Sequence, residues 1–145
     1  MKLGSLGLAW LGRSASAFGK AAQILDDVWS LSPTVRGQVI ESRLAVSEYK
    51  DWYNIGNSQN GFFPLVDFQK GINLVSLKSV DTTGSSWVTR MQDHIRDLGS
   101  RAATVNGQRA NMILDLRVQP GGAGQAQQLI DYGSRQGVTV VVKEY

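Results

Sequence analysis

The chain has 145 residues, 42% of them hydrophobic, which suffices for one globular domain with a real core and is too little for two. Its formal net charge is only +3, with a pI of about 9.4, so the composition permits a polyanionic partner without demanding one. The chain contains no cysteine, which excludes a disulfide framework, a thiolate metal site and a cysteine nucleophile, and leaves oxygen atoms and the single His94 as metal ligands.

The first 31 residues are expected to stand apart from the main domain. Residues 3–11 are apolar, but two glycines interrupt them and Arg13 follows. A leader segment, or the cut edge of a longer chain, therefore explains them better than a secretory signal. At 14–29, apolar residues recur at three- and four-residue steps, which predicts an accessory helix. We accordingly divide the chain into a leader segment at 1–31 and a main domain at 32–145.

A helix is predicted after Ser32, which can cap it, because Pro33 suits the first helical position. Ile40 and Glu41 would lie beside its buried stripe, so that Glu41 can lean toward the core. On this helix alone, a solvated glutamate is the simpler interpretation. The stripe expected to be buried contains Val35, Val39 and Leu44.

Two strands are predicted next, at 62–68 (FFPLVDF) and at 72–80 (INLVSLKSV). Pro64 cannot donate to a ladder, which favours an edge position for the first strand. A two-residue turn at 70–71, with glycine supplying a positive φ, would join the strands as a hairpin. In that register Asp67 lies opposite Leu74.

This hairpin carries polar side chains on a face that should be packed. Alternate strand residues share a face, so Asp67, Ser76 and Lys78 are expected to converge. Burying such groups without partners would cost several kcal/mol. Asp67 would be a hard oxygen ligand for Mg²⁺, and Lys78 could position or deprotonate a water or stabilise charge on a phosphate. A buried ion pair between Asp67 and Lys78, with Ser76 filling space, explains the pattern equally well.

The remaining residues predict an α/β frame. A helix is expected at 85–98, a strand at 111–118, a second helix at 124–137 and a last strand at 138–144 in a buried parallel position. Alternating strands and helices indicate a mixed sheet covered on both sides. The inner face of the first of these helices should contain Trp87, Met91, Ile95 and Leu98.

Other polar residues offer weaker signals. His94 lies on the polar flank of its predicted helix and is expected to be exposed or hydrogen-bonded rather than catalytic. The segment PGGAGQ at 120–125 is read as a plain strand-to-helix turn, since it lacks a complete phosphate-binding motif. The best candidates for phosphate-backbone contacts, although a solvated face explains them equally well, are Arg90, Arg96, Arg101 and Arg109.

Several of these segments together carry a family resemblance. The helix segment RGQVIE, the strand FPLVDF and the strand containing SLK resemble the PD-(D/E)XK nuclease pattern, in which helix Glu, strand Asp and a (D/E)-x-K strand share one metal site. The wider run FFPLVDFQKGINLVSLKSVDTTGSSWVTRMQDHIRDLG is similar to the C-terminal toxin domains of contact-dependent growth inhibition proteins and related polymorphic toxins. The resemblance covers 33–145 and implies a restriction-endonuclease-like fold, roughly αββαβαβ.

The resemblance also implies a site. It places Glu41 at the helix acid and Asp67 at the strand acid, both as metal ligands, with Lys78 at the lysine. Ser76 stands where the family usually has Asp or Glu, so either another acid contributes or the metal is held mainly by the first two and water. Asp81 is the natural additional acid, although a loop or helix-capping role is simpler.

The function implied is that of a metal-dependent endonuclease toxin, with Mg²⁺ as the expected metal. Toxins that resemble this chain cleave tRNA, which we favour, or DNA, by attack of metal-activated water. The resemblance further implies a cognate immunity protein, delivery from a producing bacterium as part of a larger toxin, and action in the target-cell cytoplasm without stable membrane association. A non-enzymatic α/β binding domain, with Asp67 and Lys78 as a structural pair, is the alternative from another class.

Overall fold

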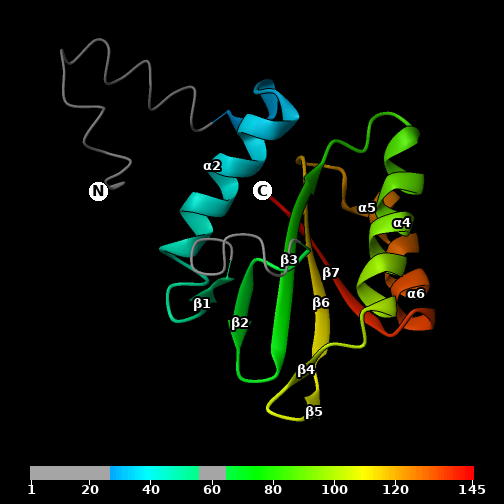
Figure 1. The fold of residues 1–145 in the computed structure, drawn as a ribbon. Coiled ribbons are helices and arrows are strands. Elements are labelled where there is room, and N and C mark those ends of the chain that lie inside the picture. Colours follow the sequence, from blue (N-terminus) through cyan, green and yellow to red (C-terminus); the bar gives the residue numbers. More distant parts are fainter. Residues whose placement is uncertain (1–26, 56–64) are drawn as a thin grey trace, which may run out of the picture.

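The computed structural model describes residues 27–55 and 65–145, and these form an α/β fold around a five-stranded mixed sheet (Figure 1). The strands lie in the order β1 (Tyr53–Asn54), β2 (Phe68–Lys70), β3 (Asn73–Val80), β6 (Asn111–Val118) and β7 (Val138–Glu144). The β1–β2 and β2–β3 pairs are antiparallel, whereas β3, β6 and β7 are parallel. A separate two-stranded hairpin consists of β4 (Thr104–Val105) and β5 (Gln108–Arg109).

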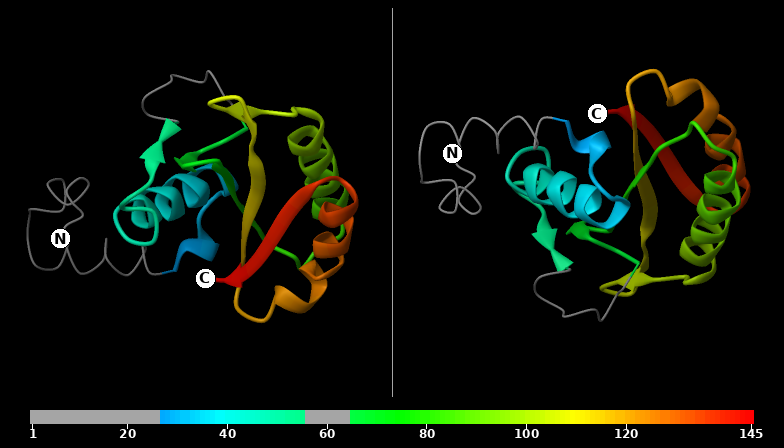
Figure 2. Two further views of the ribbon diagram at one scale, coloured as in Figure 1. Left: turned by 90° about the horizontal axis from the view of Figure 1, so that it is seen from below. Right: turned by 90° about the horizontal axis from the view of Figure 1, so that it is seen from above.

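Helices cover both faces of the sheet, as predicted (Figures 1 and 2). One face carries α2 (Pro33–Ala45), preceded by the short 3-10 helix η2 (Val28–Ser30). The other carries α4 (Ser86–Ser100) and α6 (Gln128–Arg135), with the one-turn α5 (Ala123–Ala126) before α6. None of the helices in the described residues is long and apolar enough to cross a membrane.

The core has two parts, one on each face of the sheet. The strand β3 contributes to both, because Leu74 and Val75 point to opposite faces. The larger part lies between the sheet and α4 and α6; its main side chains are Leu74, Trp87, Met91, Ile95, Leu98, Leu114, Leu116, Leu129 and Val140. The smaller part lies under α2 and contains Val28, Ile40, Leu44, Tyr49, Phe68 and Val75.

The helix α2 begins at Pro33 as predicted, but its buried stripe differs. Val35 was expected inside and is 44% exposed, whereas Ile40 is only 1% exposed. The buried positions are Arg36, Ile40 and Leu44, at four-residue spacing. Arg36 is accommodated because its guanidinium lies 4.7 Å from the ring centroid of Trp29 and its Nε donates to Ser79 Oγ at 3.3 Å.

The hairpin forms, with a shorter first strand and another turn. The predicted strand at 62–68 is replaced by Phe68–Lys70; residues 65–67 are not in a strand, and 62–64 lie outside the described residues. Lys70 pairs with Asn73, so the turn is at 71–72, with φ of 60° at Gly71. The register is therefore two residues from the expected one, a shift that leaves the paired side chains of 68–70 and 73–75 on their expected faces.

Both ends of the described chain meet at the sheet. The strand β7 is parallel as predicted, but it lies at the edge of the sheet beside β6, so that Val138 and Val140 are buried and its other residues are partly or fully exposed. The predicted helix at 14–29 lies largely outside the described residues. At its end, Val28 is buried in the smaller core and Trp29 Nε1 donates to the carbonyl of Tyr145 at 3.0 Å.

Candidate functional site

The site begins with a β-bulge at Asp67. Phe68 pairs with Val75, and the N–H of Asp67 also donates to the carbonyl of Val75 at 2.8 Å. Asp67 and Phe68 thus both oppose Val75, and two residues opposite one define a β-bulge. A bulge bends its strand and redirects a side chain. The bulge turns the Asp67 carboxylate toward β3, where its Oδ2 accepts the N–H of Leu77 at 2.7 Å.

Beyond Val75, β3 has an edge that β2 does not reach. In the described part of the chain, β2 pairs only with the first three residues of β3. We call residues 76–80, on the side of β2, the β3 edge. The Asp67 carboxylate occupies this edge by satisfying the N–H of Leu77, and burial raises the pKa of that carboxyl, while the Leu77 bond and Lys78 act in the opposite direction.

Glu41 and Lys78 complete a cluster of three charges at the β3 edge. Glu41 is half-buried on α2; burial and the nearby Asp67 carboxylate raise its pKa, and Lys78 opposes the change. Lys78 interacts electrostatically with both acids. The structure therefore brings together the helix acid, the strand acid and the lysine that the sequence singled out.

Lys78 is exposed, contrary to the expectation of a packed ammonium. Lys78 and Asp67, both in the described part of the chain, form no direct ion pair. The structural alternative, a buried pair that stabilises the hairpin, does not describe this geometry. An exposed ammonium beside two partly buried carboxylates is instead available to a ligand.

Ser76 is engaged away from the two acids. Its buried hydroxyl lies 2.8 Å from Nε2 of His94 on α4. His94 is only 9% exposed, so the prediction that it lies on a polar flank is wrong. The signal was present, because His94 falls seven residues after Trp87, at a spacing that continues the inner face of the helix. Burial, with a further effect of Lys78, lowers the pKa of His94 to about 4, against an opposing effect of Asp97.

The donor set at the β3 edge suits a hard divalent cation with few protein ligands. Across residues 27–55 and 65–145, no group of three or more His, Asp or Glu side chains is placed to hold a metal ion. Mg²⁺ is often bound by one or two carboxylates, with waters and substrate phosphate completing its octahedron. Glu41 and Asp67 are two such carboxylates, and the raised pKa of each would be relieved by a nearby cation.

Asp81 is occupied in the loop after β3. Its Oδ1 accepts the N–H of Thr83 at 2.9 Å, and its pKa is lowered by hydrogen bonds from Thr83, with a further contribution from Arg36. Asp81 therefore has the loop role that the sequence analysis considered the simpler alternative. The interactions of Asp81 are with Thr83 and Arg36, and not with the acids of the β3 edge.

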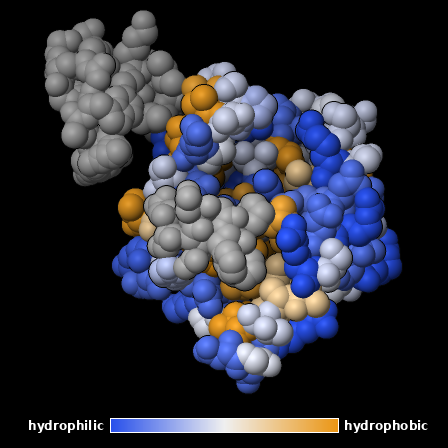
Figure 3. Space-filling view, in the orientation of Figure 1, coloured by the Kyte–Doolittle hydropathy of each residue, from blue (hydrophilic) through white to orange (hydrophobic). Residues whose placement is uncertain are grey.

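The four arginines singled out from the sequence are all exposed but lie in different places. Arg90 is one helical turn before His94 and so shares the side of α4 that faces β3. Arg96 lies on the flank toward α6, where it pairs with Asp93 and donates to Tyr132 Oη at 3.1 Å. Arg101 follows α4, and Arg109 is in β5. The polar side of α4 belongs to the hydrophilic surface on the right of Figure 3.

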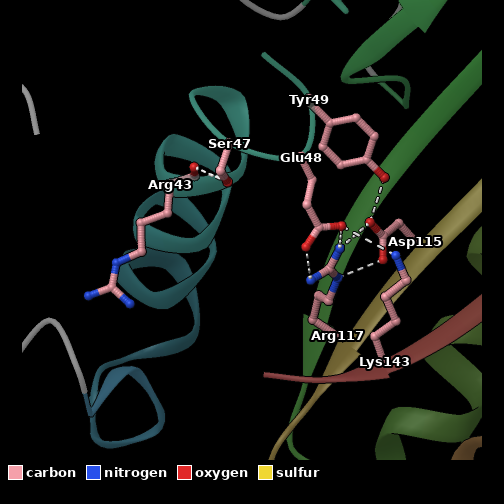
Figure 4. A network of polar contacts seen from close by, with 7 residues as sticks. All are labelled: Arg43, Ser47, Glu48, Tyr49, Asp115, Arg117 and Lys143. Atoms are coloured by element: carbon pink, nitrogen blue, oxygen red, sulfur yellow. Dashed lines mark hydrogen bonds and ion pairs between the residues drawn. The ribbon is translucent and has the colours of Figure 1, made fainter. Parts of the chain in front are cut away.

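A buried polar network that the sequence patterns did not predict lies on the α2 side of the sheet (Figure 4). Asp115 and Arg117 on β6 form a bidentate pair, at 2.7 and 2.9 Å, and Tyr49 Oη donates to Asp115 at 2.5 Å. Arg117 also contacts Glu48, at 2.9 Å, and Glu48 accepts from Lys143 at 3.3 Å. The signal was an acid and an arginine two residues apart on one face of an otherwise apolar strand.

Electrostatics hold this network in its charged form. Burial and the Asp115 bond raise the pKa of the Tyr49 hydroxyl, so it stays protonated and donates. Burial alone would lower the pKa of Arg117, but its bonds to Asp115 and Glu48 raise it. The same bond from Arg117 lowers the pKa of Glu48. The network has its charges satisfied and joins the segment after α2 to β6 and β7, so we regard it as structural.

No protein-family model matches the chain, and no curated protein sequence matches it either.

Proposed function

We propose that this protein is a metal-dependent endonuclease that hydrolyses phosphodiester bonds at the β3 edge, and that it acts as a toxin between competing bacteria. The observation that carries the nuclease proposal is the convergence of Glu41, Asp67 and Lys78. Two partly buried acids with raised pKa values and one exposed ammonium are a costly arrangement for a structural hairpin and a useful one for phosphate chemistry.

Glu41 and Asp67 would hold the divalent cation, with Mg²⁺ as the expected ion. When bound, such an ion lowers the pKa of a coordinated water and polarises a phosphoryl oxygen. The bond from Leu77 fixes the rotamer of Asp67 and leaves its other oxygen, Oδ1, for the ion. Glu41 reaches the site from another element, so the two acids are positioned independently.

Lys78 would act on the substrate. Its exposed ammonium can donate to a non-bridging phosphate oxygen and stabilise the charge that develops there. Ser76 has a supporting role in this proposal, because its hydroxyl is bonded to His94 and holds α4 against the catalytic strand. His94 stays neutral at pH 7, which avoids a second positive charge beside Lys78.

The toxin role, and tRNA as the favoured substrate, rest on the resemblance of 33–145 to C-terminal toxin domains of contact-dependent growth inhibition proteins. The same resemblance supports a PD-(D/E)XK-type nuclease fold, a cognate immunity protein that covers the site, and delivery into the cytoplasm of a target cell. DNA is the second substrate to be tested, because related toxins cleave either nucleic acid.

The direct test is to incubate the purified protein with total tRNA and, separately, with plasmid DNA, in Mg²⁺ and in EDTA. We expect Mg²⁺-dependent shortening of tRNA and little action on the plasmid. Cleavage of the plasmid alone would support the nuclease activity but show that DNA, and not tRNA, is the substrate. If neither nucleic acid is cut in Mg²⁺ or Mn²⁺, or if cleavage survives EDTA unchanged, the proposal of a metal-dependent nuclease is wrong.

A further inference from the structure

Four exposed cations gather at the end of the sheet where the parallel strands begin. Lys70 is the last residue of β2, and Arg109 is the last residue of β5. Arg101 and Arg135 stand at the C-terminal ends of α4 and α6. We call this group the basic end.

Hydrogen bonds and close packing hold these segments together. The N–H of Asn111, which directly follows the β4–β5 hairpin, donates to the carbonyl of Ile72 in the β2–β3 turn at 2.8 Å. The last turn of α4 lies against the residues after α6, since a Cβ on Gly99 would be only 2.1 Å from the carbonyl oxygen of Gln136. The β2–β3 turn, the β4–β5 hairpin and the C-terminal ends of α4 and α6 share the lower end of the molecule in Figure 1.

The basic end contains no carboxylate to balance its charge. The segments that form it, 69–73, 98–112 and 133–139, include all four cations and no Asp or Glu. Within the described residues, none of the four takes part in an ion pair, whereas Arg96 and Arg117 do. The opposite end of the parallel strands carries the acids Asp81 and Glu144.

Helix stabilisation accounts for only half of this group. A cation at a helix C-terminus is stabilised by the helix dipole, which explains Arg101 and Arg135. Asp97 and Asp131, about one turn earlier on the same helices, are the nearest acids along those helices. Lys70 and Arg109 are on strands, so they do not belong to a helix C-terminus. Their exposure beside two further cations needs another reason.

We propose that the basic end binds the sugar–phosphate backbone of the nucleic-acid substrate, at phosphates several nucleotides from the bond that is cut. This inference rests on the proposed nuclease function. Lys70 pairs with Asn73, which is five residues before Lys78 along β3. The positions of Lys70 and Lys78 along the strand direction are therefore about 17 Å apart. At roughly 3.4 Å per phosphate along a helical strand, that span corresponds to about five nucleotides.

The strand cations allow a matched test, because they can be removed without touching a helix end. The test variant is Lys70→Gln/Arg109→Gln, and the control is Lys50→Gln/Lys143→Gln, which also removes two exposed cations, neither of them at the basic end. Both pairs are made in an Asp67→Asn background, to prevent cleavage. Binding of a 24-nucleotide single-stranded RNA is then measured by fluorescence anisotropy over a range of salt concentrations, after thermal melting shows that all variants are folded.

We expect the test variant to lose at least ~10-fold in affinity and about 1.4 in the slope of log K against log salt, from ~0.7 for each of two contacts. The control should keep both values close to those of the parent. Equal losses in the two variants, or none in either, would overturn the basic end as a specific contact surface. If the Asp67→Asn parent binds RNA and the unmutated protein cleaves it, either of these results overturns only the proposal for the basic end. If the unmutated protein neither binds nor cleaves nucleic acid, the nuclease proposal itself is wrong.

Discussion

Asp67 is placed by its own backbone and by one bond to Leu77, so its charge can be removed while its shape is kept. In Asp67→Asn, the amide oxygen can still accept the Leu77 N–H. We expect the cleavage rate to fall at least ~10²-fold, because a metal ligand and its charge are lost. The melting temperature at pH 7 should hold or rise, since the raised pKa of Asp67 means that the fold disfavours its charged form.

Cleavage rate and melting temperature should be measured on one preparation of Asp67→Asn. A raised carboxyl pKa contributes stability that is present below the ordinary value of about 3.9 and is lost as the pH rises through the folded value. The stability gained by the variant should therefore appear at neutral pH and vanish in acid. Loss of stability and activity together at pH 7 would assign Asp67 to the structure instead.

His94 gives a pH dependence of the opposite sign. Its folded pKa of about 4 is below the ordinary value of about 6.5, so its contribution to stability is present above 6.5 and is lost as the pH falls toward 4. The charged groups that act on it are Lys78 on β3 and Asp97 on its own helix. We expect urea unfolding of the wild type to show an acid loss of up to about 3 kcal/mol from this group.

The matched variant for this prediction is His94→Gln, which can retain a hydrogen bond to Ser76 and cannot titrate. The difference in unfolding free energy between wild type and variant should shrink as the pH falls from 6.5 to 4. A difference that stays constant over this range would show that the fold does not lower the pKa of His94.

At the scale of secondary structure, periodicity predicted the helices and strands better than it predicted how they meet. The faces of the paired hairpin residues, 68–70 and 73–75, were right, because alternation fixes the face of each residue in a regular strand. The register was off by two, because Gly71 takes the first rather than the second turn position. The bulge at Asp67 could not be read from spacing, since it places Val66 and Phe68 on opposite faces of the sheet, whereas residues two apart in a regular strand share a face.

The β4–β5 hairpin and the buried face of α2 were also not predicted correctly from the sequence. The β4–β5 hairpin was not predicted, although its turn, Asn106–Gly107, has positive φ at both positions, a combination for which Asn-Gly is the usual sequence. For α2, Val35 and Ile40 are both apolar, and only the position of the smaller core decides which one is buried. That choice depends on contacts with β3, which the helix sequence does not contain.

Two helical glycines allow a test of how closely α4 packs. Gly99→Ala should destabilise the protein by at least ~1 kcal/mol, because its Cβ would meet the backbone carbonyl of Gln136. Gly37→Ala on α2, where no atom lies within 4 Å of the added Cβ, should stabilise it by about 0.5–1 kcal/mol through helix propensity. Chemical denaturation of both variants provides the measurement. The same effect in both, in either direction, would mean that the α4 contact is not tight.

At the scale of the whole molecule, the network around Arg117 ties the α2 side of the protein to the sheet. Arg117→Met would leave the Asp115 carboxylate, which is 2% exposed, without its cation. We expect a loss of about 3–5 kcal/mol, the usual cost of an uncompensated buried charge. The double variant Asp115→Asn/Arg117→Met should recover most of that loss, because no charge is then stranded and the amide oxygen can still accept from Tyr49. Unfolding free energies of both variants test this, and a double variant no better than the single one would contradict it.

The candidate site was predictable in part for a physical reason. Asp67 and Lys78 could be singled out because charged residues in an apolar strand pattern are conspicuous, whereas Glu41 was assigned through the family resemblance. Their convergence required the structure, since it depends on the bulge and on the place of α2 over β3. The bond between Ser76 and His94 and the exposure of Lys78 are tertiary facts as well, because they depend on where β2 ends and α4 packs.

The central claim is that Lys78 acts on a phosphate at the β3 edge and does not support the fold. Lys78→Met keeps most of the side-chain stem and removes only the charge. The rate of Mg²⁺-dependent tRNA cleavage by this variant is the most direct test, with unfolding free energy measured on the same preparation. We predict a rate at least ~10² lower, with a stability within ~0.5 kcal/mol of wild type because the residue is exposed. A variant that cleaves tRNA at the wild-type rate would contradict the claim.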